Sequence, residues 1–265
     1  MFQERLIFPG AARSHAVAEY VVTPARDTEI VQLSTPSQKK TVALFGAALT
    51  RNGAGRADAA SCPTILYFYG NGMCLADTVD GEFSEFRRLG CNVMVVEYVG
   101  YGMAEGEPSQ TGCFEAADAA YAALAARKDI DPARIIPGGW SLGGAMALHV
   151  AAGHPVAGLF MFSSFTSMTE VAQAHYPFLP VTLMLNHPFR SIDTIGSIRV
   201  PILIGHGTTD ELVPYSMSLR MKAAATGSPS VTHLKVEGAG HNDFYTVGQA
   251  QILAALDGLV HREKY

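Results

Sequence analysis

From about residue 64 onward, short apolar runs rich in β-branched and aromatic residues alternate with longer helical patterns. This alternation is typical of βαβ units, in which a helix connects two neighbouring strands that run in the same direction. The sequence therefore predicts a mostly parallel sheet. We expect its strands at Thr64 to Tyr69, Val93 to Tyr98, Ile135 to Gly138, Gly158 to Phe162, Pro201 to His206 and Val231 to Val236.

The pattern before residue 64 is different. The runs Ala16 to Thr23, Glu29 to Leu33 and Lys40 to Phe45 are typical of antiparallel strands. The clearest helix of the later part is expected from Cys113 to Lys128, where alanines supply helix propensity and Asp129-Ile-Asp-Pro132 ends the pattern. The predicted fold class is α/β, with a central, mostly parallel sheet, antiparallel N-terminal strands and helices on both faces.

One stretch breaks the alternation. Between Ser167 and Arg190 the chain is rich in apolar residues but is interrupted by Pro177, Pro180 and Pro188. Such an insertion is too irregular for a core helix and suits a small cap over a pocket, the alternative being a loop that packs down on the body. With 265 residues, 48% of them hydrophobic and 16% charged, we expect one domain over residues 1–265 with a cap at about 167–190.

Charge and cysteine content exclude several classes of partner. The net charge is −5 and basic residues form no long run, so the chain offers no electrostatic footprint for nucleic acid. The four cysteines have neither C-x-x-C spacing nor a histidine at zinc-finger distance, and we expect reduced thiols and no metal. No segment supplies about 18 uninterrupted apolar residues, so no membrane span is expected. A cytoplasmic protein is the simplest interpretation, and a chain trimmed of its leader would look the same.

The candidate nucleophile lies in Gly139-Trp-Ser-Leu-Gly143, which matches the pattern G-x-S-x-G. The bare pattern is weak, but here it follows a predicted strand and opens a helical run. A sharp turn between strand and helix exposes the Ser141 hydroxyl, and the flanking glycines leave room for the crowded backbone. The helix start adds N–H donors and the positive end of a dipole. The alternative is a glycine-rich packing turn.

A serine nucleophile needs a histidine base that is oriented by a carboxylate. His241 lies on a glycine-rich turn at the carboxyl end of a predicted strand, where sheets of this type place their site residues. Asp210 follows the preceding strand in the same way. Asp243 is the rival carboxylate, but it is two residues from the histidine and fits a local turn better. His206, at the end of its strand, is expected to support the following loop.

An oxyanion produced at the serine needs two hydrogen-bond donors. The first is expected to be the backbone N–H of Leu142, and the second that of Asn71 in the glycine-rich loop Tyr69 to Met73. Gly72 and Met73 are the less favoured second donors. Gly70-Asn-Gly72 also resembles half of a dinucleotide fingerprint, so a nucleotide-dependent enzyme is the competing interpretation. Leu75 occupies the place of the third glycine, and no phosphate-loop motif exists, so this class is disfavoured.

With these motifs placed, the chain resembles the small-lidded hydrolases of the α/β-hydrolase superfamily, a group that includes prolyl-aminopeptidase-like, bud-emergence-type and protein depalmitoylating enzymes. The order Ser, Asp, His along the chain is the one that these hydrolases use. Tyr69 stands where the family usually has histidine. The stretches that carry the resemblance are Tyr67-Phe-Tyr-Gly-Asn-Gly, Glu97-Tyr-Val-Gly-Tyr-Gly-Met-Ala-Glu-Gly-Glu-Pro-Ser, Gly139-Trp-Ser-Leu-Gly-Gly, Ser163-Ser-Phe-Thr-Ser, His175-Tyr-Pro-Phe-Leu-Pro, His206-Gly-Thr-Thr-Asp-Glu-Leu-Val-Pro and Gly238-Ala-Gly-His-Asn-Asp.

The resemblance implies a Ser141, Asp210 and His241 triad, an oxyanion loop at Asn71, and acyl transfer to water without a cofactor. Aromatic and apolar residues near these motifs are expected to line an acyl pocket: Tyr69, Met73, Trp140 and Phe165. They favour an uncharged small-molecule ester as substrate, with a serine peptidase or an acyl-protein thioesterase as the alternative. A ligand-binding protein that keeps the fold without turnover is the alternative of another class.

Overall fold

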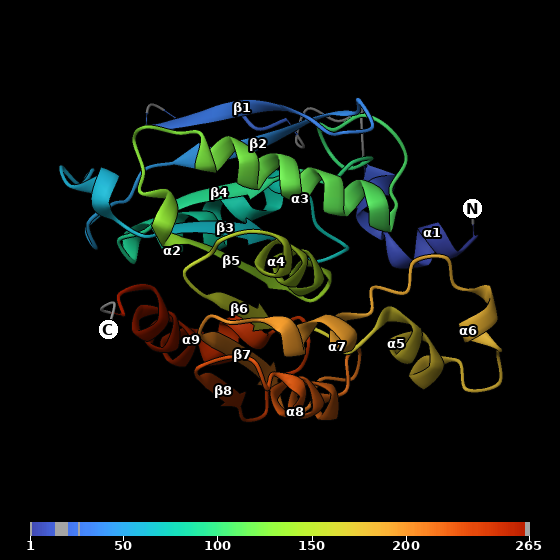
Figure 1. The fold of residues 1–265 in the computed structure, drawn as a ribbon. Helices are drawn as coiled ribbons and strands as arrows, with labels where there is room; N and C mark the ends of the chain where they lie inside the picture. Colours follow the sequence, from blue (N-terminus) through green and yellow to red (C-terminus); the bar gives the residue numbers. More distant parts are fainter. Residues whose placement is uncertain (1, 14–20, 26, 263–265) are drawn as a thin grey trace. The chain divides into compact units, whose positions relative to one another are not determined.

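The computed structural model describes residues 2–13, 21–25 and 27–262. The chain divides into two compact units, Met1–Pro137 and Gly138–Tyr265. Each unit combines β-strands with flanking helices (Figure 1). All three residues of the predicted triad belong to the second unit, so the geometry of that unit decides how they meet.

In the described part of the first unit, strands β1 to β4 lie in the order β1-β2-β4-β3. Strands β1 and β2 pair antiparallel, β2 and β4 also pair antiparallel, and β3 and β4 are parallel. Helix α3 packs against β1 and β4, and α2 packs against β4. The bounds are β1 Thr28–Ser34, β2 Lys40–Gly46, β3 Thr64–Phe68, β4 Asn92–Val96, α1 Phe2–Ile7, α2 Ser84–Arg88 and α3 Gln110–Ala125. Short 3-10 turns occur at Pro9–Arg13, Ala59–Ser61, Leu75–Thr78 and Pro132–Arg134, and a π-helical turn at Val79–Phe83.

Strands β5 to β8 follow one another in the order β5-β6-β7-β8 and pair parallel throughout. Strand β5 begins in the last residues of the first unit, and the other three belong to the second. Strand β6 lies in the core of the second unit: all its side chains, from Leu159 to Phe162, are apolar and buried. Helix α4 packs against β6, α8 against β7, and α9 against β7 and β8. The bounds are β5 Ile135–Trp140, β6 Leu159–Phe162, β7 Ile202–Gly207, β8 Val231–Val236, α4 Leu142–Gly153, α8 Tyr215–Ala224 and α9 Phe244–Val260.

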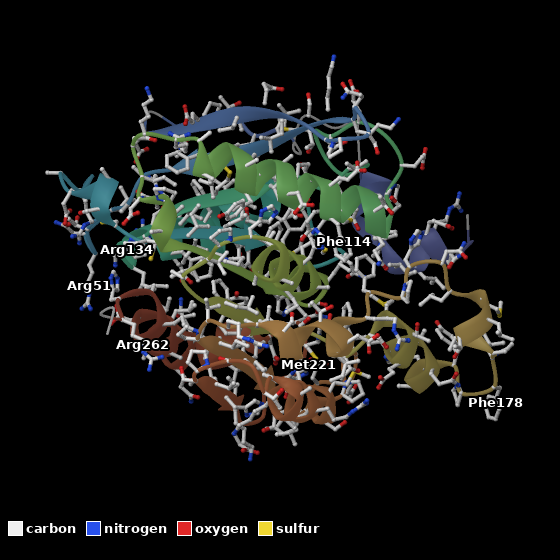
Figure 2. All side chains as sticks on the ribbon, in the orientation of Figure 1. Arg51, Phe114, Arg134, Phe178, Met221 and Arg262 are labelled. Atoms are coloured by element: carbon white, nitrogen blue, oxygen red, sulfur yellow. The ribbon has the colours of Figure 1, made fainter. Side chains whose placement is uncertain are left out.

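The predicted cap segment contains two short helices, α5 Met168–His175 and α6 Val181–Met184. Its three prolines lie outside both helices, as the loss of a backbone N–H requires. Figure 2 shows Phe178 at the tip between them, pointing away from the ribbon, and 96% of this side chain is exposed. The segment is followed by α7 Ser191–Thr194 and a 3-10 turn at Ile195–Ser197. That this segment caps a single domain stays a prediction.

The strands predicted from Glu29 onward are confirmed, with ends that differ by no more than two residues. The predicted strand Ala16 to Thr23 falls mostly on residues 16–20, outside the described residues, and residues 21–23 form no strand. Helix α3 begins three residues before the predicted start. The reason is an N-cap, because the Oγ of Ser109 accepts a hydrogen bond of 3.0 Å from the backbone N–H of Gly112.

Candidate active site

Ser141 lies in a strained turn between strand β5 and helix α4. Its backbone φ of 55° and ψ of −118° fall in a region that residues other than glycine rarely adopt. The turn is anchored to the neighbouring strand, because the backbone N–H of Ser141 donates to the carbonyl O of Phe162 at 2.8 Å. It is also tightly packed: a Cβ added at Gly139 would lie 2.3 Å from the backbone of Gly143. The glycines therefore permit the strained serine.

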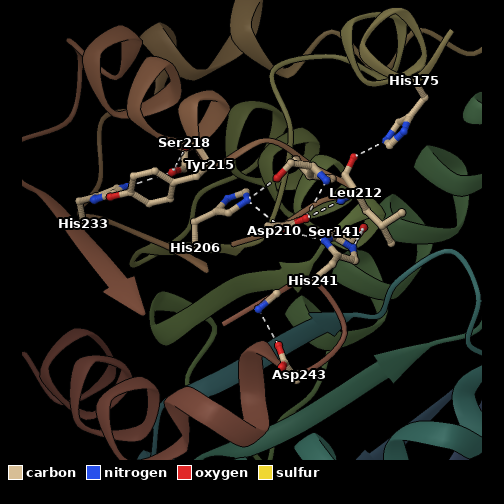
Figure 3. A network of polar contacts seen from close by, with 12 residues as sticks. Ser141, His175, His206, Asp210, Leu212, Tyr215, Ser218, His233, His241 and Asp243 are labelled. Atoms are coloured by element: carbon tan, nitrogen blue, oxygen red, sulfur yellow. Dashed lines mark hydrogen bonds and ion pairs between the residues drawn. The ribbon is translucent and has the colours of Figure 1, made fainter. Parts of the chain in front are cut away.

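The three predicted triad residues meet in the second unit (Figure 3). The Nε2 atom of His241 lies 2.9 Å from the Oγ of Ser141, and its Nδ1 atom lies 2.7 Å from Oδ2 of Asp210. Ser141 follows β5, Asp210 follows β7 and His241 follows β8, so the carboxyl ends of parallel strands supply all three. With Asp210 ionised, the Nδ1 atom of His241 carries the proton and Nε2 accepts the serine hydroxyl.

Asp210 is a buried carboxylate with a complete set of donors. Its Oδ1 accepts the backbone N–H groups of Leu212 at 3.0 Å and Val213 at 2.7 Å, and its Oδ2 faces the imidazoles of His241 and His206. Burial by itself raises the pKa of this carboxyl group. The hydrogen bonds from His206, His241 and Val213, with the charge that His241 can carry, outweigh burial and hold the pKa of Asp210 below its ordinary value. Asp210 is therefore the anionic member of the site.

Two neighbours fix the position of His241 and of the Asp210 loop. The indole ring of Trp140 packs on the His241 imidazole, with ring centroids 5.0 Å apart. The Nε2 atom of His175, at the end of α5, lies 2.8 Å from the carbonyl O of Leu212, which links the predicted cap segment to the loop that carries Asp210 (Figure 3). The sequence did not indicate this second contact, because the two residues are 37 positions apart.

The rival carboxylate of Asp243 has a local role. Its Oδ1 accepts the backbone N–H of Gly240 at 2.6 Å, within the turn that presents His241. Since the Nδ1 atom of His241 faces Asp210 instead, the geometry favours the carboxylate that the sequence favoured. His206 supports the loop after β7 as expected, because its Nε2 lies 2.8 Å from the carbonyl O of Val213.

The two predicted oxyanion donors belong to different units. Leu142 is the first residue of α4, so its backbone N–H has no acceptor inside the helix. In the first unit, the side chain of Asn71 donates to the carbonyl O of Ile7 at 3.0 Å, and its own carbonyl O accepts the hydroxyl of Tyr101 at 3.1 Å. These contacts fix the loop that carries Asn71. Its backbone N–H as a donor stays a prediction.

Tyr69, at the start of the Asn71 loop, is fully buried and bound to a buried acid. Its hydroxyl donates to Oε1 of Glu97, which also accepts the backbone N–H of Leu75 at 3.1 Å, and Oε2 of Glu97 accepts the N–H of Met103 at 3.2 Å. Burial raises the pKa of Glu97 although all three hydrogen bonds lower it. Glu97 thus binds the loop at Tyr69, before Asn71, and at Leu75, after it. Sequence reasoning missed this role because Glu97 follows β4, whereas the loop follows β3. That Tyr69, Met73, Trp140 and Phe165 line a pocket stays a prediction.

Within residues 2–13, 21–25 and 27–262, no group of three or more metal-binding side chains gathers at one point. No helix in that same part of the chain combines the length and the apolar character needed to cross a bilayer. The site described above is thus built from a hydroxyl, an imidazole and a carboxylate.

Comparison with known proteins shows the family of this chain. The sequence model of the prolyl oligopeptidase family matches residues 108–256. The α/β hydrolase domain-containing protein WAV2 of Arabidopsis thaliana is 31% identical over 93% of this chain and 83% of its own length. An uncharacterized protein of Mycobacterium tuberculosis is 41% identical over 58% of this chain, and the match spans only about half, 54%, of that relative. An esterase structure from Pyrococcus furiosus superimposes with a TM-score of 0.71 at 15% identity, covering 91% of this chain and 95% of the other.

The family model and the match to WAV2 place the chain in the α/β-hydrolase superfamily. The Pyrococcus furiosus esterase, at 15% identity, shows the fold of this chain and not its activity. The family model covers more than half of the chain and WAV2 matches nearly all of it, so the chain belongs to the prolyl oligopeptidase family.

Proposed function

We propose that the chain cleaves acyl esters of small molecules by a serine hydrolase mechanism, with Ser141, His241 and Asp210 as its triad. The observation that carries the proposal is the continuous hydrogen-bonded path from the Oγ of Ser141 through the imidazole of His241 to the carboxylate of Asp210. A serine hydroxyl at its free pKa is a poor nucleophile, and this path supplies the base that activates it.

In the proposed reaction the Oγ of Ser141 attacks the substrate carbonyl carbon while the Nε2 atom of His241 takes the hydroxyl proton. The resulting oxyanion is stabilised by the backbone N–H groups of Leu142 and Asn71. His241 then returns the proton to the leaving alcohol as the acyl-enzyme forms. Water, deprotonated by the same nitrogen, attacks the acyl-enzyme and releases the acid, and Ser141 recovers its proton. No step requires a cofactor.

The choice of an ester rests on the apolar side chains predicted to line the acyl pocket: Tyr69, Met73, Trp140 and Phe165. A serine peptidase is the second candidate, because the matching family is that of prolyl oligopeptidases. An acyl-protein thioesterase would use the same groups. A cytoplasmic location is part of the proposal and is supported by the four cysteines, which are all buried and form no disulfide within the described residues.

The test is reaction of wild type, Ser141→Ala and Ser218→Ala with a fluorophosphonate probe, beside hydrolysis of p-nitrophenyl esters and of aminoacyl and thioester substrates. Ser218 is a matched control, because it is a buried serine of the same unit whose Oγ bonds the carbonyl O of Tyr215 and His233. We expect labelling and esterase turnover in wild type and Ser218→Ala, and neither in Ser141→Ala. Preference for aminoacyl substrates would favour the peptidase. A wild type that neither labels nor hydrolyses any substrate would leave a ligand-binding protein as the better explanation.

A further inference from the structure

A second histidine touches the carboxylate of the proposed triad. His206, at the end of β7, is fully buried, and its Nε2 atom lies 3.1 Å from Oδ2 of Asp210 and 2.8 Å from the carbonyl O of Val213 (Figure 3). The same Oδ2 faces the Nδ1 atom of His241 at 2.7 Å. One carboxylate oxygen of Asp210 thus lies between two imidazoles.

The surroundings of His206 determine which of its nitrogens carries the proton. Both groups beside Nε2 are oxygens that only accept hydrogen bonds, so Nε2 must be the donor. The Nδ1 atom is buried and has no hydrogen-bond partner in the described part of the chain. A proton on Nδ1 would therefore be a buried donor without an acceptor, which is costly. The imidazole is held in the form that directs a single N–H at Asp210 and Val213.

We propose that His206 is a positioning residue for the reaction: its Nε2–H fixes the orientation of the Asp210 carboxylate and competes with His241 for the charge on Oδ2. The inference rests on the proposed function. Because Oδ1 is held by the N–H groups of Leu212 and Val213, the contact with His206 removes the remaining freedom of the carboxylate. The carboxylate then presents Oδ2 to His241 along one direction, as the hydrogen-bond partners of metal ligands orient those ligands in other proteins.

Three other titratable groups complete the surroundings of His206. Tyr215 of α8 packs edge-on against the imidazole, with ring centroids 5.9 Å apart, and itself contacts the ring of His233 on β8. Burial lowers the pKa of His233, with smaller contributions from the charges of Lys222 and His206. None of these groups lies between His206 and Asp210, so removing the His206 N–H acts first on the carboxylate.

The consequences for catalysis have a definite direction. His206 is fully buried, so its loss should leave substrate affinity unchanged and lower kcat, because His241 is aligned with Ser141 for less of the time. When Oδ2 loses the donor of His206, the negative charge of the carboxylate is no longer shared and interacts more strongly with the imidazole of His241. That charge favours the imidazolium form, so the acid limb of the pH profile should move to higher pH.

The experiment compares wild type with His206→Phe, His206→Gln and His233→Gln. Phe keeps a ring without the N–H, and Gln restores an N–H near the position of Nε2. His233→Gln is the matched control, because that imidazole bonds Ser218 and not Asp210. The kinetic constants kcat and KM for one p-nitrophenyl ester are measured over roughly pH 5 to 9, the range in which histidine titrates, together with the melting temperature.

For His206→Phe we expect kcat to fall roughly 10- to 100-fold, as when other residues that orient a reacting group are lost, with KM unchanged and the acid limb displaced upward. His206→Gln should recover much of kcat and most of the displacement. If the Phe variant does not fold, His206→Asn, whose shorter amide does not reach Oδ2 of Asp210, takes its place with the same expected loss. Wild-type kcat and acid limb in both variants, with only a lower melting temperature, would show a merely structural histidine and overturn the inference alone. A wild type without esterase activity would overturn the proposed function as well.

Discussion

Replacing Asp210 with asparagine tests the proposed triad most sharply, because the change preserves the shape of the side chain but replaces one oxygen, which accepts hydrogen bonds, with an NH₂ group, which donates them. The amide oxygen can still accept the N–H groups of Leu212 and Val213 in place of Oδ1. The amide NH₂ then replaces Oδ2 and faces the donors of His206 and His241. Two donors in contact repel, so His241 is expected to move its proton to Nε2 and lose the lone pair that accepts the Ser141 hydroxyl.

The magnitude follows from the number of functions lost. A histidine in the wrong tautomer neither accepts the serine proton nor has its imidazolium stabilised, and the corresponding change in a Ser-His-Asp protease lowers kcat about 10⁴-fold. At about 1.36 kcal/mol per factor of ten, this is about 5.4 kcal/mol of transition-state stabilisation. Since Asp210 does not touch the acyl group in the proposed mechanism, KM is expected to change little.

The assay is steady-state hydrolysis of a p-nitrophenyl ester by wild type, Asp210→Asn and Asp243→Asn, with circular dichroism to establish folding. Asp243 is the control because it is exposed and bonds only Gly240 among the contacts found for its side chain in the described residues. We expect Asp243→Asn to retain kcat within a small factor. A folded Asp210→Asn that loses less than about tenfold in kcat would refute the assignment of Asp210 as the orienting carboxylate.

Two further predictions concern the residues that shape the site. Gly139→Ala should destabilise the fold by about 1–3 kcal/mol in urea unfolding and abolish probe labelling, because its Cβ would lie 2.3 Å from the Gly143 backbone; a fully active, equally stable variant would contradict this. Tyr69→Phe should destabilise by about 1–3 kcal/mol, because Glu97 loses a buried donor. The pKa of Glu97 is raised in the native state, so the stability that this group contributes is fully present below its unfolded pKa of about 4.5 and is lost as pH rises through the folded pKa. Tyr69→Phe should raise the folded pKa further and extend that loss to higher pH, and unchanged pH dependence of unfolding would count against it.

The sequence predicts the candidate site where local chemistry and sheet topology coincide. Ser141 could be predicted because G-x-S-x-G between strand and helix describes one short piece of backbone. Asp210 and His241 could be predicted because they follow strands, and parallel strands end at one edge. Helix α3 was misplaced at its start by three residues, since alanine propensity is strong throughout and the Ser109 cap sets the boundary.

Sequence reasoning could not predict contacts that depend on how loops and helices fold in three dimensions. The contact of His175 with Leu212 joins residues 37 positions apart and depends on where α5 lies. The contact of His206 with Asp210 joins residues four positions apart, but it depends on how the loop after β7 folds back. The buried Glu97 that holds Tyr69 gave no signal, because a single acid among apolar residues has the same appearance whether it is exposed or paired.

By itself the sequence determined the fold class, the order of the strands along the chain and the identity of the proposed reacting groups, because hydrophobic periodicity and turn chemistry are local properties. Only the tertiary structure decided which nitrogen of His241 faces which partner and that Asp210 is shared by two histidines. The distances of 2.7 Å and 2.9 Å that join His241 to Asp210 and to Ser141 depend on the packing of the whole second unit, because the three residues follow different strands, and such packing cannot be predicted from local sequence.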